Sequence, residues 1–113
     1  RNDIPLQPAT DNSRAADQAA AAAKADALEK VEQEIDQLSN RSAAVNASLD
    51  AMRQQQAASG YGLRGDIASR LASMNANLGK AQDAIARKDE VRAKKYSDMA
   101  ASDVEVLEKF LGR

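Results

Sequence analysis

The chain has no cysteine, no histidine and no tryptophan, and both of its prolines, Pro5 and Pro8, lie near the N-terminus. It therefore has no disulfide scaffold, no Cys/His zinc site, no thiol nucleophile and no histidine to serve as acid or base. Aromatic residues make up 3% of the sequence, and all five glycines lie at or beyond Gly60. This scarcity argues against an all-β fold, which needs aromatic and β-branched residues in its strands and glycine in its turns.

A charge excess of either sign is also missing. Lysine and arginine total 16 and aspartate and glutamate total 17, which gives a formal net charge of −1. Nucleic-acid-binding domains normally carry a basic excess, so we expect no nucleic-acid contact. No run of 18 apolar residues exists, so we expect no direct membrane insertion of this fragment.

The first 13 residues are polar and contain both prolines. We predict that residues 1–13 form a linker or extended segment, followed by a single helical domain over residues 14–113. Linkers of this kind often follow a trimmed signal peptide or membrane anchor, which slightly favours an extracytoplasmic location. Four consecutive cap-forming residues, Thr10 to Ser13, predict a helix start near Ser13. The unbroken run from Ala19 to Ala23 then favours helix strongly.

Two heptad patterns predict that two helices pair. In the first, the spacing alternates between three and four residues, and the flanking positions are not apolar, so the apolar stripe is narrow. A second stripe with the same spacing follows a glycine-rich segment, in which Gly60 suits a helix C-terminus. The predicted coiled-coil seam comprises Leu28, Val31, Ile35, Leu38, Val45, Leu49, Met52, Ile67, Leu71, Met74, Leu78 and Ile85. Ser42 is the polar member of the first stripe, as a tolerated polar layer or as a device that sets the register.

A highly charged segment, residues 87–95, interrupts the second heptad pattern. Two all-α architectures follow. In the first, a helix over 14–58, a turn at 59–65 and a helix over 66–111 form a long antiparallel coiled-coil hairpin, with a kink or break near 87–90. In the second, Asp89 caps a third helix and the chain forms a three-helix bundle. We favour the hairpin, because no Gly or Pro breaks residues 80–111 and because it brings Lys94 and Lys95 to the acidic residues near 25–26.

No catalytic constellation is visible. Carboxylates occur at helical spacing, as in Glu29, Glu32 and Asp36, but this pattern is typical of a solvated helix face. We therefore expect no catalytic, cofactor-binding or metal site and no enzymatic activity. The class of any small-molecule ligand is left open.

The expected function is that of a non-catalytic helical interaction or spacer domain with a protein partner or self-association. It would be the soluble part of a larger bacterial-type protein, with a membrane anchor as one way of attachment. The unsatisfied surface is expected on the Ala-rich face of residues 15–27. The alternative is a ligand- or partner-sensing ectodomain of a signalling protein, whose pocket would show as buried polar residues between helices.

Overall fold

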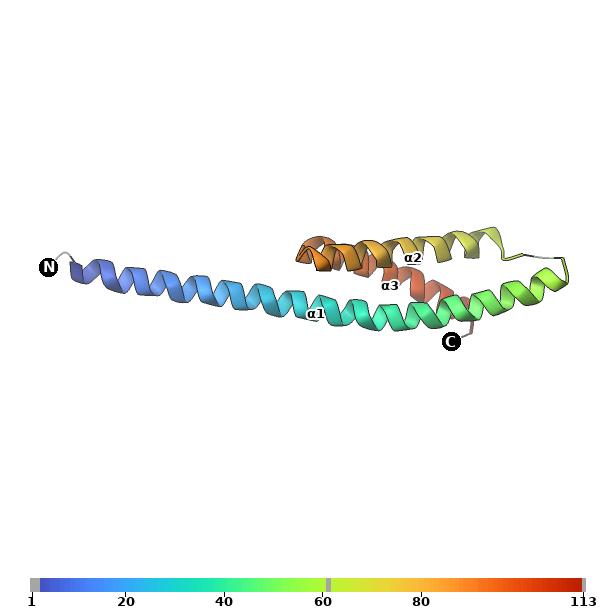
Figure 1. Ribbon diagram of the computed structural model, residues 1–113, viewed down its shortest axis with the longest axis horizontal. Coiled ribbons are helices and arrows are strands. Elements are labelled where there is room, and N and C mark those ends of the chain that lie inside the picture. Colours follow the sequence, from blue (N-terminus) through green and yellow to red (C-terminus); the bar gives the residue numbers. More distant parts are fainter. Residues whose placement is uncertain (1–2, 61, 113) are drawn as a thin grey trace.

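The computed structural model describes the backbone of residues 3–60 and 62–112, with side chains from residue 14 onward. This part of the chain contains three helices and no strand: α1 (Asp3–Ala58), α2 (Gly65–Ala86) and α3 (Glu90–Phe110). The all-α class predicted from the sequence is confirmed. The molecule is a rod with principal extents of 88 × 19 × 18 Å, and α1 runs along its whole length (Figure 1).

The chain folds as the three-helix alternative and not as the two-helix hairpin that we favoured. Helix α2 runs back along the C-terminal half of α1, and α3 then reverses again and packs against both (Figure 1). Helix α3 is therefore parallel to α1. Lys94 near its start meets Glu34, and Glu108 near its end meets Arg41. The predicted approach of Lys94 and Lys95 to residues 25–26 is wrong for the same reason.

The turn between α2 and α3 explains the correction. Lys88 adopts a left-handed backbone with φ of 60°. The N–H of Asp89 donates to the Ala84 carbonyl, and the N–H of Lys88 donates to the Ile85 carbonyl. These two hydrogen bonds together form a Schellman cap. Asp89 then caps α3, because its side chain accepts from the N–H of Arg92 at 3.1 Å. The absence of glycine was therefore a poor argument for a continuous helix, because a lysine occupies the position that glycine usually takes.

The N-terminal boundary also differs from the prediction. Helix α1 begins at Asp3 and includes most of the segment that we expected to be extended. Pro5 lies in the first turn of α1, where a missing N–H removes no helical hydrogen bond. At the other end of α1 the expectation agrees with the structure, because the helix stops at Ala58 and Gly60 has φ of 85°.

The core lies between α2, α3 and residues 31–49 of α1. It is built mainly from aliphatic side chains, and α3 contributes Val104, Leu107 and two alanines, Ala93 and Ala100. Alanine at these two positions lets α3 approach its neighbours closely. A thin core of this kind matches the low content of large apolar residues. A single layer of helices surrounds it.

Candidate interaction surfaces

The residues of the predicted seam all lie at least partly inside the bundle. Eight are buried: Val31, Ile35, Leu38, Val45, Leu49, Ile67, Met74 and Leu78. Four are half-buried: Leu28, Met52, Leu71 and Ile85. These side chains hold the three helices together and leave little of their surface for a partner.

Ser42 is buried among the apolar residues of α1 and belongs to a polar connection between α1 and α2. The side-chain amide of Asn46 donates to the Ser42 carbonyl at 2.9 Å. Asn46 and Asn75 of α2 also exchange amide hydrogen bonds in both directions, at 3.0 and 3.1 Å. Because such a pair satisfies both amides only in one alignment, it fixes how far α2 is shifted along α1.

A second polar cluster, centred on Asp103, joins α2 to α3. The Asp103 side chain is 5% exposed. Its carboxylate accepts from Arg70 at 3.0 Å, from the Ser73 hydroxyl at 2.7 Å and from the Asn77 amide at 3.2 Å. The buried charge is therefore compensated by one cation and two further donors, which is the condition for keeping a carboxylate inside a protein.

Sequence reasoning missed this cluster. Asn77 and Asp103 directly precede the core residues Leu78 and Val104, so each lies at the edge of an apolar stripe. Only the observed pairing of α2 with α3 shows that these two edges face each other.

Two ion pairs connect the outer surfaces of α1 and α3. Arg41 makes two hydrogen bonds with the Glu108 carboxylate, and these raise the pKa of the guanidinium. Lys94 donates to Glu34 at 3.1 Å and lies 3.2 Å from Asp98, and both contacts raise the pKa of its ammonium group. Pairs this exposed contribute at most about 1 kcal/mol each, so they align the helices more than they stabilise them.

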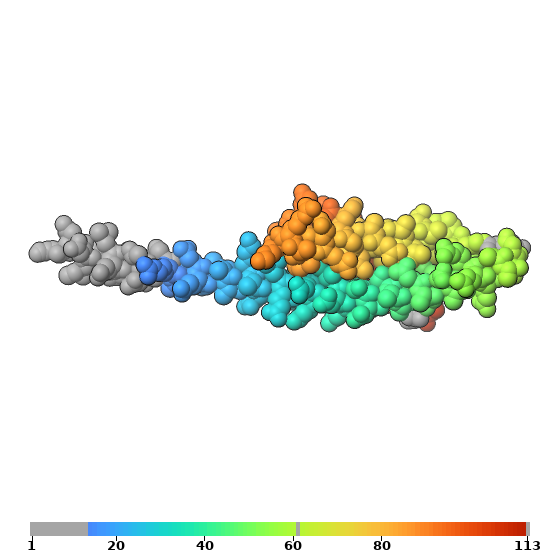
Figure 2. Space-filling model, in the orientation of Figure 1, coloured from blue at the N-terminus to red at the C-terminus, as the bar shows by residue number. Residues whose placement is uncertain are grey.

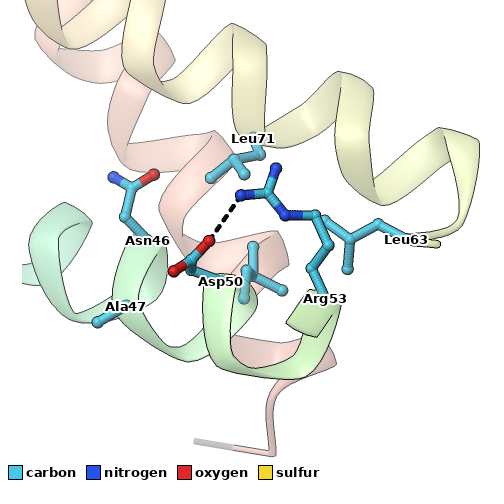
Figure 3. Close-up of a pocket in the computed structure, with 7 residues that line it drawn as sticks. Asn46, Ala47, Asp50, Arg53, Leu63 and Leu71 are labelled. Atoms are coloured by element: carbon cyan, nitrogen blue, oxygen red, sulfur yellow. Dashed lines mark hydrogen bonds and ion pairs between the residues drawn. The ribbon is translucent and has the colours of Figure 1, made fainter. Parts of the chain in front are cut away.

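A hollow of about 430 Å³ opens where α1 meets the start of α2. Leu49, Leu63 and Leu71 line it together with Asp50 and Arg53. Figure 3 shows the Arg53 side chain extending from α1 towards α2, with its guanidinium group directed at Asp50. The distance between these charged groups is 2.6 Å, and both side chains are about half exposed or more. The two charges therefore neutralise each other at a surface that is open to solvent.

The remaining polar candidates are distributed over the surface. Glu29, Glu32 and Asp36 are exposed on α1. Among the residues with described side chains, no three carboxylates converge in a way that could hold a metal ion. Of the basic segment, Arg87 pairs with Asp83 and Arg92 with Asp89, so it forms no continuous basic patch.

The N-terminal half of α1 leaves the bundle. Every residue from Arg14 to Asp26 is exposed, because α2 and α3 extend no further than the α2–α3 turn. Figure 2 shows this part of the rod as a single helix that protrudes beyond the turn. We call residues 14–27 the bare segment of α1.

A second uncovered surface lies on α3. In the described part of the chain, the exposed large apolar side chains are Val91, Met99, Val106 and Phe110, with exposed fractions of 75%, 44%, 41% and 37%. With Lys95 and Ser102 they are spaced 4, 4, 3, 4 and 4 residues apart, so they share one face of the helix. We call these six residues the outer stripe of α3.

No protein-family model, no curated protein and no solved structure matches this chain. In the described residues, no helix combines the length and the apolar character that crossing a membrane requires. The assignment of function therefore depends on the surfaces described above.

Proposed function

We propose that this chain is a non-catalytic helical interaction and spacer domain. The observation that carries the proposal is the shape of α1. A helix of 56 residues is about 84 Å long, and the α2–α3 hairpin supports only its C-terminal half. Such an element holds its two ends apart and presents the bare segment to another helix.

The paired polar groups support a structural role over a catalytic one. The Asp103 carboxylate of α3 accepts a hydrogen bond from Asn77 of α2. The side-chain amides of Asn46 and Asn75 bind to each other between α1 and α2. A general acid or base needs a cleft in which its pKa is shifted and its proton can reach a substrate. The hollow at the α1–α2 join is open to solvent, and the charged groups of Asp50 and Arg53 that line it neutralise each other.

In the proposed setting the domain is the soluble part of a larger bacterial-type protein, with a membrane anchor as one way of attachment. We further propose that the narrow apolar stripes of α1 and α2 pack in the manner of a coiled coil within the bundle. The buried Ser42, Asn77, Ser97 and Asp103 are the feature that a ligand-sensing ectodomain would need. Asn77 and Asp103 are hydrogen-bonded to each other, so these two groups are already paired within the protein. This pairing supports the spacer function more than the sensor function.

Spin-label distances test whether α1 is stiff enough for a spacer. Ala15, Gln33 and Ala51 are exposed, and they lie 18 residues or five full turns apart on the side of α1 away from the hairpin. The chain has no cysteine, so Ala15→Cys/Gln33→Cys and Gln33→Cys/Ala51→Cys can each be labelled without background. Pulsed electron paramagnetic resonance, with unlabelled chain added in excess, gives the distance within one molecule.

For a stiff α1, both pairs give narrow distributions near the same backbone separation of about 27 Å. The second pair lies in the supported half and serves as the control. A broad distribution for Ala15→Cys/Gln33→Cys beside a narrow one for the control would show that the bare segment is not a rigid helix. The spacer function would then be wrong.

A further inference from the structure

The outer stripe of α3 and the bare segment of α1 are both uncovered, and each offers what the other lacks. The stripe carries Val91, Met99, Val106 and Phe110. The bare segment offers a row of small side chains, the exposed Ala16, Ala20 and Ala23 and the half-buried Ala27, on the face that leads into the buried Val31. Large side chains on one helix and small ones on the other allow close approach of the two axes.

The spacings of the two rows agree when the helices run in opposite directions. The alanines are spaced 4, 3 and 4 residues apart, and so are Val106, Ser102, Met99 and Lys95 when read backwards. Ala16 then lies opposite Val106, Ala20 opposite Ser102, and Ala23 opposite Met99. In the same alignment Asp26 lies within one residue of the level of Lys95, which places opposite charges together at the end of the contact.

We propose that two copies of this chain form an antiparallel dimer in which the bare segment of each copy packs on the outer stripe of α3 of the other. Within one copy this contact is impossible, because α3 lies beside the opposite half of α1 (Figure 1). Between two antiparallel copies, the protruding half of each α1 runs past the bundle of the other. Each three-helix bundle thereby gains a fourth helix. This inference rests on the proposed interaction function and names its partner.

The two-fold arrangement also accounts for the size of the surface. Helix α3 has 21 residues and is about 31 Å long, so the bare segment, whose 14 residues span about 21 Å, can lie along two thirds of it. One such helix contact is small for a stable complex, but a two-fold axis produces it twice. Specific interfaces typically bury about 1,200–2,000 Å², a range that two such contacts reach more readily than one.

The first experiment compares two Ala→Glu variants of the bare segment by sedimentation equilibrium. Ala20→Glu places a charge in the predicted contact, whereas Ala22→Glu lies two residues on, about 200° around the helix, and is the matched control. Both positions are exposed, so neither change disturbs the bundle. We expect Ala20→Glu to weaken dimerisation by at least about tenfold, because symmetry introduces the charge twice, and Ala22→Glu to leave it unchanged. Val106→Glu should weaken it equally.

Disulfide trapping tests the alignment. The variant Ala23→Cys/Met99→Cys should form a covalent dimer on mild oxidation, while Ala22→Cys/Met99→Cys should not. A wild-type chain that stays monomeric at every concentration overturns the proposal and assigns the stripe to a different protein. A dimer that Val106→Glu breaks and Ala20→Glu leaves intact also overturns it, because α3 would then pair with α3. The spin-label distances within one molecule are independent of either outcome.

Discussion

At the scale of single residues, polar side chains decide how the helices align. Apolar contacts tolerate sliding, because one aliphatic side chain packs nearly as well as the next. Hydrogen bonds do not tolerate it, since a buried donor without its acceptor costs about 1–3 kcal/mol. The buried bond between Asp103 and Asn77 therefore selects one alignment of α2 with α3. The exposed Asn46–Asn75 pair adds a directional contact between α1 and α2, at a lower energetic cost when it is broken.

This argument predicts that Asp103→Ala destabilises the fold strongly. The change removes the carboxylate that accepts from Ser73 and Asn77 and that pairs with Arg70, and Asn77 keeps only its bond to the Ser73 hydroxyl. We expect a loss of about 2–3 kcal/mol in the free energy of unfolding, measured by urea denaturation followed by circular dichroism. Arg70 is 44% exposed, so water solvates the abandoned cation and keeps the loss below that of a fully buried pair.

The matched control is Asp98→Ala on the same helix. Asp98 is 63% exposed and lies 3.2 Å from Lys94. An exposed pair of this kind contributes little, so the loss should stay below about 1 kcal/mol. Equal losses for the two variants would mean that burial of Asp103 has no energetic consequence and that the polar cluster does not set the alignment.

At the scale of helices, the heptad pattern predicted which faces of α1 and α2 are buried, because periodic burial leaves a direct trace in the sequence. Ala58 ends α1 as expected, and the eight buried seam residues lie in the core. The sequence also placed a break near 87–90 and offered Asp89 as the cap of a third helix, but the same reasoning could not decide on the reversal of the chain there. The reversal depends on the backbone of one residue, Lys88, and the left-handed conformation has no sequence signal when glycine is absent.

The conformation of Lys88 makes a prediction about stability. A left-handed backbone costs a non-glycine residue about 1–2 kcal/mol, and glycine avoids this cost while losing some entropy on folding. Lys88→Gly should therefore raise the free energy of unfolding by about 0.5–1 kcal/mol. Thermal melting monitored by circular dichroism measures the change.

The neighbouring Arg87→Gly is the control. Arg87 has φ of −89°, which any residue adopts, so glycine brings only its entropic cost there. This variant should lower stability by about 0.5–1 kcal/mol. If Lys88→Gly also lowers stability, the turn does not have the left-handed geometry, and the reversal of the chain must be built differently.

The candidate surfaces were predictable only in part. The bare segment of α1 follows from composition, because a run of alanines can form a helix without tertiary contacts. The sequence of α3 shows one apolar stripe, Tyr96, Ala100, Val104, Leu107 and Leu111, with Met99, Val106 and Phe110 beside it. The first set faces the core, but the pattern did not predict that the second set forms an exposed stripe of its own. Which face points inward is decided by the alanines at 93 and 100, which allow close packing on that side.

At the scale of the whole molecule, folding and assembly involve different parts of α1. Residues 31–49 contribute the buried side chains that hold the bundle, while residues 14–26 are exposed and contribute nothing to its core. A chain that begins at Lys24 should consequently keep the bundle intact. At low concentration, where dimers dissociate, its melting temperature should stay within about 2 °C of that of the full chain, because a change of 1 kcal/mol would shift it by about 4–8 °C.

The two chains should differ only when the concentration is raised. Dimerisation stabilises the folded state by mass action, so the melting temperature of the full chain should rise with concentration. The chain beginning at Lys24 lacks Ala16, Ala20 and Ala23, the small side chains that the outer stripe of α3 would contact, and its melting temperature should be independent of concentration. Differential scanning calorimetry over a hundredfold range of concentration measures both. A lower melting temperature for the shortened chain at the lowest concentration would show that the bare segment stabilises its own bundle, and folding and assembly would then not be separable along α1.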